Sequence, residues 1–330
     1  MKSFERKIAV ITGGGTGMGR ELAIALSGEG CHVAMCDISE QNMQETLSLC
    51  QSGATGDIRI TTHLCDVSSE EQVLAFKDAT LLAHETDHVN LLFNNAGIAG
   101  GGSFIVDKRE DWERTFDICW FGVYYCSRAF VPLLVASDDA YLINTSSING
   151  FWAAIGPGVA HTSYCAAKFA VKGFTEALIT DLSVNAPHVK AAVVMPGHIG
   201  TSIVINSSKA RGRNSAMEMT TEEVAVSRAL MLKRGLPVGN LSDDHIREAM
   251  QQRALDFRDK APTSAKQAAN VILDGVRAEK WRILIGDDAY AIDERVRATP
   301  EDAYSEGFFD TLIQDGIFNA INGEEPDQKH

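Results

Sequence analysis

Short runs of β-branched and other apolar residues alternate with longer amphipathic stretches along most of this 330-residue chain. Seven runs have the length of a strand, and most of them are apolar throughout, as is typical of parallel strands buried on both faces. They lie at residues 8–12, 32–36, 58–64, 89–93, 141–145, 189–195 and 282–285. The alternation predicts an α/β fold in which βα units wind into one doubly wound, seven-stranded parallel sheet.

The rhythm of strands stops between residues 202 and 262. This segment is polar, has helical patterns at 221–232 and 243–260, and is broken by Gly235 and Pro237. Because a helical insertion after a strand has no place in the sheet itself, we interpret residues 202–262 as a helical lid over the substrate.

A C-terminal extension, residues 287–330, completes a single domain that spans residues 1–330. It mixes acidic residues with large apolar ones, which are Tyr304, Phe308, Phe309, Ile313 and Phe318. A disordered tail is poor in such residues. We therefore expect the extension to pack, against this chain or against another subunit.

Composition narrows the function classes. Acidic residues number 44 against 30 basic ones, a net charge of −14, which argues against nucleic acid and anionic membrane surfaces as partners. There is no run of 18 apolar residues and no apolar leader, so we expect no membrane span and a cytoplasmic location. The seven cysteines are scattered without a CxxC pair, which predicts reduced core residues.

Two local patterns precede the fourth predicted strand. Ser68 is followed three residues later by Glu71, which predicts a capping box at the start of a helix. Residues 84–88 match the HExxH pattern of zinc proteases, with His84 and His88 as its histidines. Because this pattern falls at a helix-to-strand connection, far from the carboxyl ends of the strands, we expect no metal site there.

A glycine-rich segment directly follows the first predicted strand. It reads Gly13-Gly14-Gly15-Thr16-Gly17-Met18-Gly19 and leads into a helical pattern. Glycines let the backbone approach a pyrophosphate closely, and a helix N-terminus supplies amide donors and a favourable dipole. The segment predicts a dinucleotide site in which Gly13, Thr16, Gly17, Met18 and Gly19 bind the cofactor.

The choice of cofactor depends on Asp37, which follows the second predicted strand. Its carboxylate can accept hydrogen bonds from the adenosine ribose but would repel the extra phosphate of NADP. No basic residue stands at Thr16 or Ile38 to offset that repulsion. We expect NAD as the cofactor, bound next to Asp37 and Ile38, and we expect Arg20 to point away from the glycine loop into solvent.

Further motifs follow in a fixed order. They are Asp66-Val67, Asn94-Asn95-Ala96-Gly97, Ser147, Tyr164-Cys165-Ala166-Ala167-Lys168 and Pro196-Gly197-His198-Ile199-Gly200-Thr201. With the glycine pattern TGxxxGxG, this order resembles the short-chain dehydrogenase/reductase family over residues 5–201 and 263–286. The resemblance implies a Rossmann-type sheet, an oxidoreductase acting on a small alcohol or ketone, and a homodimer or homotetramer.

The resemblance also implies roles for the residues that match. Asp66 and Val67 would contact adenine, and Ile199 and Thr201 would hold the nicotinamide carboxamide. The ribose would be lined by Asn94, Ala96 and Gly97 and held by Lys168, and Tyr164 would also contact the cofactor. Ser147, Tyr164 and Lys168 would be the catalytic residues.

The pair Tyr164 and Lys168 also makes chemical sense without the family. A spacing of four residues places both side chains on one face of a helix, where an ammonium favours a neighbouring phenolate, so we expect a lowered pKa for Tyr164. Such a phenol gives a proton to a carbonyl oxygen, or takes one from an alcohol, while hydride is transferred. Ser147 would orient the same oxygen, with Ser146 as the alternative.

The segment between the catalytic serine and tyrosine is longer than is usual in the family. Its Phe151, Trp152 and Ile155 suggest an apolar wall of the substrate pocket or a subunit contact. His161 and His198 stand near the predicted site, where each either touches substrate or supports other residues.

These features predict an NAD-dependent oxidoreductase that interconverts a secondary alcohol and a ketone. One residue departs from the family pattern: Cys119 stands where most members have an asparagine that positions a water for proton relay to the lysine, and a thiol is a poor hydrogen-bonding substitute. It favours the alternative of a non-catalytic NAD-binding sensor or scaffold. A sugar-nucleotide epimerase or dehydratase is disfavoured, because Thr16 stands where its glycine pattern needs a glycine.

Overall fold

The computed structural model describes residues 1–317 except 101, 157 and 234–235. In that part of the chain, seven parallel strands form the main sheet in the order β3-β2-β1-β4-β5-β6-β9. Their bounds are β1 Ile8–Thr12, β2 His32–Asp37, β3 Ile60–Leu64, β4 Leu91–Asn94, β5 Ala140–Thr145, β6 Val189–Pro196 and β9 Arg282–Ile285. The predicted sheet is confirmed, with every strand end within two residues of its expected position.

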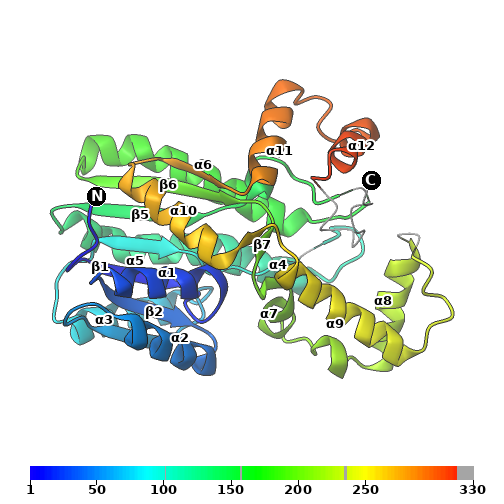
Figure 1. Ribbon diagram of the computed structural model, residues 1–330, viewed down its shortest axis with the longest axis horizontal. Coiled ribbons are helices and arrows are strands. Elements are labelled where there is room, and N and C mark those ends of the chain that lie inside the picture. The colour runs from blue at the N-terminus through cyan, green and yellow to red at the C-terminus, as the bar shows by residue number, and fades with distance from the viewer. Residues whose placement is uncertain (101, 157, 234–235, 318–330) are drawn as a thin grey trace, which may run out of the picture.

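Helices cover both faces of the sheet (Figure 1). One face packs against α1 (Gly17–Gly28), α2 (Glu40–Gly53) and α10 (Ala265–Arg277), and the other against α3 (Glu70–His84), α5 (Gly122–Val135) and α6 (Thr162–Asn185). Alternate residues of a strand enter the two cores: Ala9 and Ile11 of β1 join the first, and Ile8 and Val10 join the second. Because both faces are covered, the strands are apolar throughout, which is why the pattern identified them.

A long helical run precedes β5. It consists of α4 (Arg109–Phe116), the π-helical turn η1 (Asp117–Phe121) and α5, and by length and composition it is apolar enough to cross a membrane. Half of its most apolar window is buried inside the protein. There Cys126, Phe130 and Leu134 pack in the second core, so core packing accounts for much of its apolar character.

The predicted lid is a separate group of helices beyond the carboxyl end of the sheet. It contains α7 (Ile203–Ala210), the turn η3 (Ala216–Glu218), α8 (Thr221–Lys233) and α9 (Asp243–Asp259). Val224, Val238 and Ile246 form a small core of its own. The lid is fixed at its base by a two-stranded parallel sheet that the pattern did not predict, between β7 (Ile199–Gly200) and β8 (Thr263–Ser264). In Figure 1, α8 and α9 project away from the sheet, whereas α7 stays close to it.

The C-terminal extension packs against its own chain. Its helices α11 (Asp287–Ala298) and α12 (Glu306–Gln314) cover Trp152, which is fully buried against Phe308 and Phe309. The indole Nε1 of Trp152 donates to the carbonyl oxygen of Ala303 at 2.8 Å. Trp152 is therefore an anchor for the extension, and the expectation that it lines the substrate pocket was wrong. Phe318 lies outside the described residues.

The segment around α3 corrects one expectation and explains another. Ser69, not Ser68, caps α3 and accepts from the amide of Gln72, whereas the Ser68 hydroxyl donates to Asp66 at 2.7 Å. The helix ends at His84, and Glu85 has a left-handed φ of 52°. The two histidines of the HExxH pattern therefore do not share a helical face. All seven cysteines are buried and free, as expected.

Replacing Trp152 tests how firmly the extension is held. We expect Trp152→Ala to lower the free energy of unfolding by about 3–5 kcal/mol, because it leaves a large cavity under α12. Urea denaturation measures this change. Trp281→Ala is the matched control, because Trp281 is 46% exposed and its loss should stay within roughly 0.5 kcal/mol. Equal effects of the two substitutions would contradict the anchoring role.

Candidate active site

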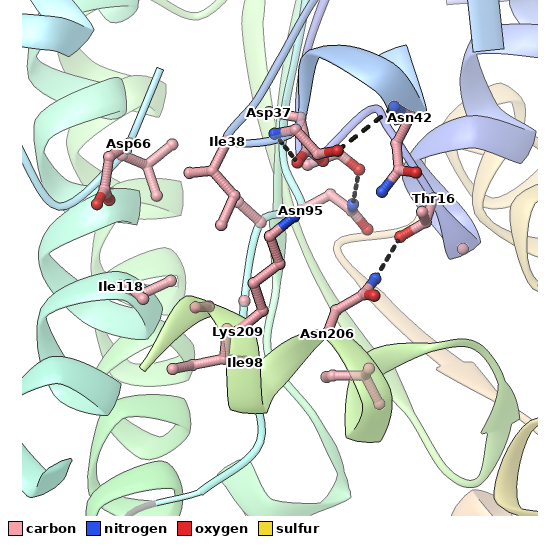
Figure 2. Close-up of a pocket in the computed structure, with 18 of the residues that line it drawn as sticks. Thr16, Asp37, Ile38, Asn42, Asp66, Asn95, Ile98, Ile118, Asn206 and Lys209 are labelled. Carbon is pink, nitrogen blue, oxygen red and sulfur yellow. Dashed lines mark hydrogen bonds between the residues drawn. The ribbon is translucent and has the colours of Figure 1, made fainter. Parts of the chain in front are cut away.

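A cavity of about 390 Å³ opens where the strand order reverses, between the carboxyl ends of β1 and β4 (Figure 2). Open α/β sheets bind their ligands at this kind of position. The predicted residues that line the cavity are Gly13, Thr16, Gly17, Met18, Asp37, Ile38, Asp66, Val67, Ala96, Gly97 and Thr201. The fold thus brings together segments that are nearly 190 residues apart (201 − 13 = 188).

The glycine loop fits a diphosphate. Gly13 and Gly17 have positive φ values of 68° and 57°, and a Cβ atom on Gly19 would lie 2.1 Å from the carbonyl oxygen of Gly13. Thr16 precedes α1 without capping it through its side chain. Its hydroxyl instead accepts from Nδ2 of Asn206 at 3.1 Å. The first amides of α1 are therefore left to an anion, and the dipole of the helix favours one.

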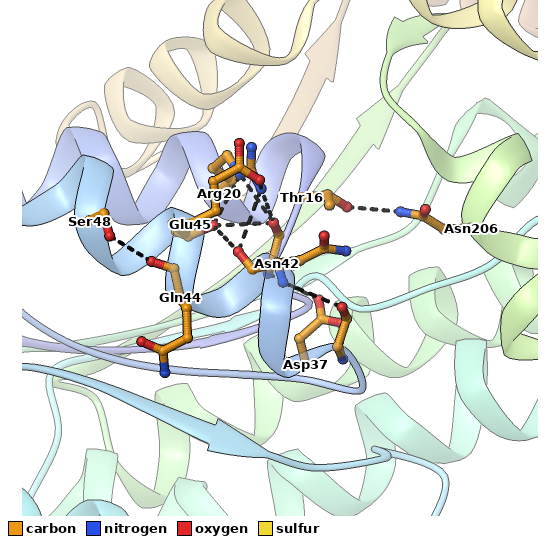
Figure 3. A network of polar contacts seen from close by, with 11 residues as sticks. Thr16, Arg20, Asp37, Asn42, Gln44, Glu45, Ser48 and Asn206 are labelled. Atoms are coloured by element: carbon orange, nitrogen blue, oxygen red, sulfur yellow. Dashed lines mark hydrogen bonds and ion pairs between the residues drawn. The ribbon is translucent and has the colours of Figure 1, made fainter.

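Both backbone polar groups of Gly15 are fixed from neighbouring elements. Figure 3 shows one of the partners, Arg20, beside Glu45. The amide of Gly15 donates to Oδ2 of Asp37 at 3.0 Å. Its carbonyl oxygen accepts from Nε and Nη2 of Arg20, at 3.0 and 2.7 Å, and from the hydroxyl of Thr46. Arg20 also pairs with Glu45 at 2.8 Å. The expectation that Arg20 points into solvent was wrong, because its long side chain folds back over the loop.

Asp37 keeps a carboxylate at the adenosine end of the cavity. Burial raises its pKa above the usual value, while hydrogen bonds from the backbone amides of Gly15 and Ser39 and the charge of Arg20 oppose that rise. These donors approach from the side of the protein. The carboxylate is therefore oriented by the backbone before any ligand binds.

Five predicted cofactor residues do not line the cavity: Gly19, Asn94, Tyr164, Lys168 and Ile199. Asn94 is buried in the sheet, where Nδ2 donates to Ser127 and Asn144. Ile199 belongs to the core, and Gly19 lies under the loop. Asn95 takes the place expected of Asn94, because the side chain turns over at the end of β4. Its Nδ2 donates to the carbonyl oxygen of Thr12 at 3.2 Å.

Other lining residues were missed by sequence reasoning. Arg114 comes from α4 and pairs with Asp66 at 2.6 Å. Burial alone would raise the pKa of Asp66, but hydrogen bonds from Arg114 and Ser68 lower it overall. Asn206 and Lys209 come from α7, and Figure 2 shows the Lys209 side chain reaching from this helix into the cavity. A helix inserted by a variable segment gives no motif by which these two could be found.

The three predicted catalytic residues lie together, and Lys168 comes close to Gly97 of the cavity wall, but none of the three lines the cavity itself. Tyr164 and Lys168 occupy the first two turns of α6, with the ammonium 5.4 Å from the centre of the tyrosine ring. Nζ of Lys168 donates to the carbonyl oxygen of Thr145 at 2.9 Å, and it would lie 3.5 Å from a Cβ on Gly97, which lines the cavity. The Ser147 hydroxyl hydrogen-bonds the tyrosine phenol.

Ser146 is excluded from the role of Ser147. Its hydroxyl donates to the carbonyl oxygen of Lys168 at 2.7 Å, buried behind the site. A Cβ on Gly150 would lie 2.1 Å from that hydroxyl oxygen, so the surroundings leave no room for it to turn. Ser146 fixes the start of α6 relative to β5.

The pKa of Tyr164 corrects an expectation. Burial raises it above the usual value, the nearby thiol of Cys119 adds to the rise, and the hydrogen bond to Ser147 opposes it. Burial also lowers the pKa of Lys168. The expected lowering by Lys168 is not found, because the ammonium is directed to the carbonyl of Thr145 and because low polarity around the pair disfavours both charged forms.

Cys119 lies beside the catalytic pair, as its alignment with the family's asparagine predicts. It is fully buried in the π-helical turn η1, and its Sγ donates to the carbonyl oxygen of Ile98 at 3.3 Å. Its Sγ would lie 3.7 Å from a Cβ on Gly97. A thiol with its proton directed to a backbone carbonyl holds the loop after β4 and presents no amide to a relay of protons.

The two histidines near the site differ in their contacts. The amide of His198 donates to Asp288 and its Nε2 hydrogen-bonds the carbonyl oxygen of Phe257, each at 2.7 Å. These bonds place His198 between the extension and the lid, away from substrate. The ring of His161 lies against Tyr164, with 4.7 Å between ring centres. Burial and the charge of Arg211 lower the pKa of His161 to about 4, so the imidazole is neutral near pH 7.

Comparisons with known proteins agree with this geometry. The sequence profile of the short chain dehydrogenase family matches residues 7–212. The chain is 35% identical over 302 residues to the candidate oxidoreductase SadH of Mycobacterium tuberculosis, covering 90% of this chain and 92% of that one. It is 32% identical over 204 residues to human epidermal retinol dehydrogenase 2, covering 61% and 63% of the two chains.

A solved structure extends the comparison over almost the whole fold. A short-chain dehydrogenase/reductase from Burkholderia phymatum in complex with NAD superposes with a TM-score of 0.71 at 27% identity, covering 92% of this chain and 95% of that one. Other structures of this fold are described with NAD or with NADP. The chain belongs to the short-chain dehydrogenase/reductase family. It is an oxidoreductase of this family.

Arg20 gives a test of the glycine loop. We expect Arg20→Met to weaken NAD binding roughly 10-fold, because the carbonyl of Gly15 loses two charge-assisted hydrogen bonds and the loop loses its fixed position. Calorimetric titration with NAD measures the change. Lys266→Met, which removes an exposed cation from α10, should bind NAD as the unmodified protein does. Unchanged affinity in the Arg20 variant would show that the loop keeps its position without this side chain.

Proposed function

We propose that this protein is an NAD-dependent dehydrogenase that interconverts a secondary alcohol and a ketone, with Tyr164 as the general acid/base. One observation carries the proposal: Ser147, Tyr164 and Lys168 lie together, and Nζ of Lys168 approaches Gly97, which lines the same cavity as the carboxylate of Asp37. The retinol dehydrogenase among the relatives is named for an alcohol substrate, which supports chemistry on a carbon that bears a hydroxyl.

The chain's own residues account for the movement of the proton. Ser147 donates to the oxygen of the substrate, and Tyr164 exchanges a proton with that oxygen. A bound nicotinamide dinucleotide would accept or supply the hydride. Because burial raises the pKa of Tyr164, the phenol is protonated at neutral pH and is ready to protonate a ketone. Oxidation of an alcohol needs the phenolate and is therefore favoured by alkaline pH.

Lys168 has a positioning role in this mechanism. Its ammonium stands between the carbonyl of Thr145 and Gly97, so it would contact the nicotinamide ribose. Cys119 leaves proton exchange with solvent to water or to another side chain. We propose a cytoplasmic homodimer or homotetramer, on the strength of the acidic composition and of the family.

Replacing Tyr164 tests the catalytic proposal against the non-catalytic alternative. The unmodified protein should produce NADH from a panel of secondary alcohols, from small cyclic to aromatic, and Tyr164→Phe should lower kcat by roughly 100-fold or more, because general acid/base catalysis is lost. The absorbance of NADH follows the reaction. Calorimetry should show that the variant still binds NAD. A protein that binds NAD but oxidises nothing in the panel would instead support the sensor.

Asp37 tests the preference for NAD. We expect Asp37→Ser to raise kcat/KM with NADP by roughly 10-fold or more, because a carboxylate no longer faces the 2′-phosphate, and to lower it with NAD. Steady-state kinetics with both cofactors measures the ratio. Asp57→Ser, a change at an exposed residue before β3, should leave the ratio unchanged. If Asp37→Ser leaves the ratio of kcat/KM with NADP to kcat/KM with NAD unchanged, this part of the proposal is overturned.

A further inference from the structure

A guanidinium group with no ion-pair partner among the described residues packs against the loop after β4. Arg211 directly follows α7, and its Nε donates to the carbonyl oxygen of Ser207 at 3.1 Å. The side chain is partly buried. In the part of the chain that the structure describes, its two terminal amino groups take part in no hydrogen bond or ion pair with protein.

The position of this guanidinium follows from the contact between α7 and the loop after β4. The hydroxyl of Ser207 accepts from the amide of Ala99 at 2.8 Å, which joins α7 to the loop after β4. The guanidinium then lies along that loop: a Cβ on Gly100 would stand 2.4 Å from Nη1 of Arg211. Gly100 has a φ of 144°, a value that suits glycine. Glycine at position 100 therefore leaves room for the Arg211 side chain, which a larger residue at position 100 would displace.

The same loop reaches the start of the catalytic helix. The amide of Thr162 donates to the carbonyl oxygen of Gly102 at 2.9 Å. Thr162 directly follows His161, whose ring lies against Tyr164. The positive charge of Arg211 acts on His161 and, after burial, is the second cause that lowers the pKa of its imidazole. The guanidinium therefore lies near the histidine whose ring packs against the predicted catalytic tyrosine.

Two carboxylates act on Arg211 through their charge but form no ion pair with it, and each has another partner. Asp111 pairs with Arg213, and Oδ2 of Asp107 accepts from the amide of Ser103 at 2.9 Å. Burial lowers the pKa of Arg211 and these two carboxylates raise it. A partly buried guanidinium is costly unless an anion meets it, and its planar donors suit a carboxylate held by two parallel hydrogen bonds.

We propose that the substrate carries a carboxylate as well as the reacting hydroxyl or carbonyl group, and that Arg211 binds this carboxylate. The inference rests on the proposed function, because it places the carboxylate relative to Tyr164. Trp152, one of the three residues expected to form an apolar wall, is buried under α12 and does not line such a wall. The lid then contributes specificity through the residue that follows its first helix.

The test compares hydroxy acids with their neutral amides. Aliphatic hydroxy acids that have the hydroxyl two, three or four carbons from the carboxylate, and the corresponding amides, are assayed with NAD. We expect at least one acid to exceed its amide in kcat/KM. Arg211→Met should lower the value for that acid roughly 10–100-fold and change that for the amide little, because only the acid loses a charged partner. Arg211→Lys should recover part of the loss.

Arg213→Met is the matched control, because it removes a cation two residues away that is paired with Asp111. It should leave the ratio of acid to amide unchanged. If the unmodified protein oxidises amides as well as acids, or if Arg211→Met lowers both alike, the inference is overturned while the proposed function stands.

A binding measurement distinguishes the proposed dehydrogenase function from the proposed carboxylate site at Arg211. Calorimetric titration of the hydroxy acids into the protein saturated with NADH measures binding without turnover. If no alcohol is oxidised, the proposed function fails, and binding of an acid that is lost in Arg211→Met but kept in Arg213→Met would still support the carboxylate site. Absence of such binding in the unmodified protein would overturn it. Thermal melting of each variant shows whether it is folded.

Discussion

The site depends on hydrogen bonds to the backbone amide and carbonyl of one residue, Gly15. Its amide is held by Asp37 at the end of β2, and its carbonyl by Arg20 of α1 and Thr46 of α2. A loop of glycines has little conformational preference of its own, so these bonds decide where it runs. They also satisfy the inner polar groups of the loop from the protein side, which leaves the amides at the start of α1 for a ligand.

The same arrangement balances charge around the cofactor groove. Arg20 is neutralised by Glu45, and Arg114 by Asp66. Asp37 keeps a carboxylate for the ribose, because backbone amides stabilise it where burial would favour the neutral acid. Lys209 reaches into the groove from α7. Because Lys209 belongs to the lid and not to the sheet, its charge can act on a negatively charged diphosphate only when α7 lies in this position.

The sequence predicted the sheet well because its strands are buried on both faces and need no tertiary information to be recognised. Tyr164, Lys168 and Ser147 could be predicted to lie together for a similar reason, since they follow strands or share a helix face. The predictions were wrong where a shift of one residue, or the reach of a long side chain, decides where a side chain lies. Asn94 and Asn95 differ only in the face to which the end of β4 turns them, and Arg20 folds back over a loop that its helical phase faces away from. The burial of Trp152 depends on α12, more than 150 residues away.

The extension and the lid act on opposite sides of the segment that follows β6. Asp288, at the start of α11, accepts from the amide of His198, and a Cβ on Gly197 would lie 2.2 Å from its carboxylate. His198 in turn contacts Phe257 of α9. The segment that leads into Thr201 is therefore fixed from outside the sheet, by parts of the chain that the strand pattern does not include. From there α7 begins, and it touches the glycine loop through Asn206 and the loop after β4 through Ser207. One short helix thus contacts both the glycine loop and the loop after β4, so its position depends on the two loops together.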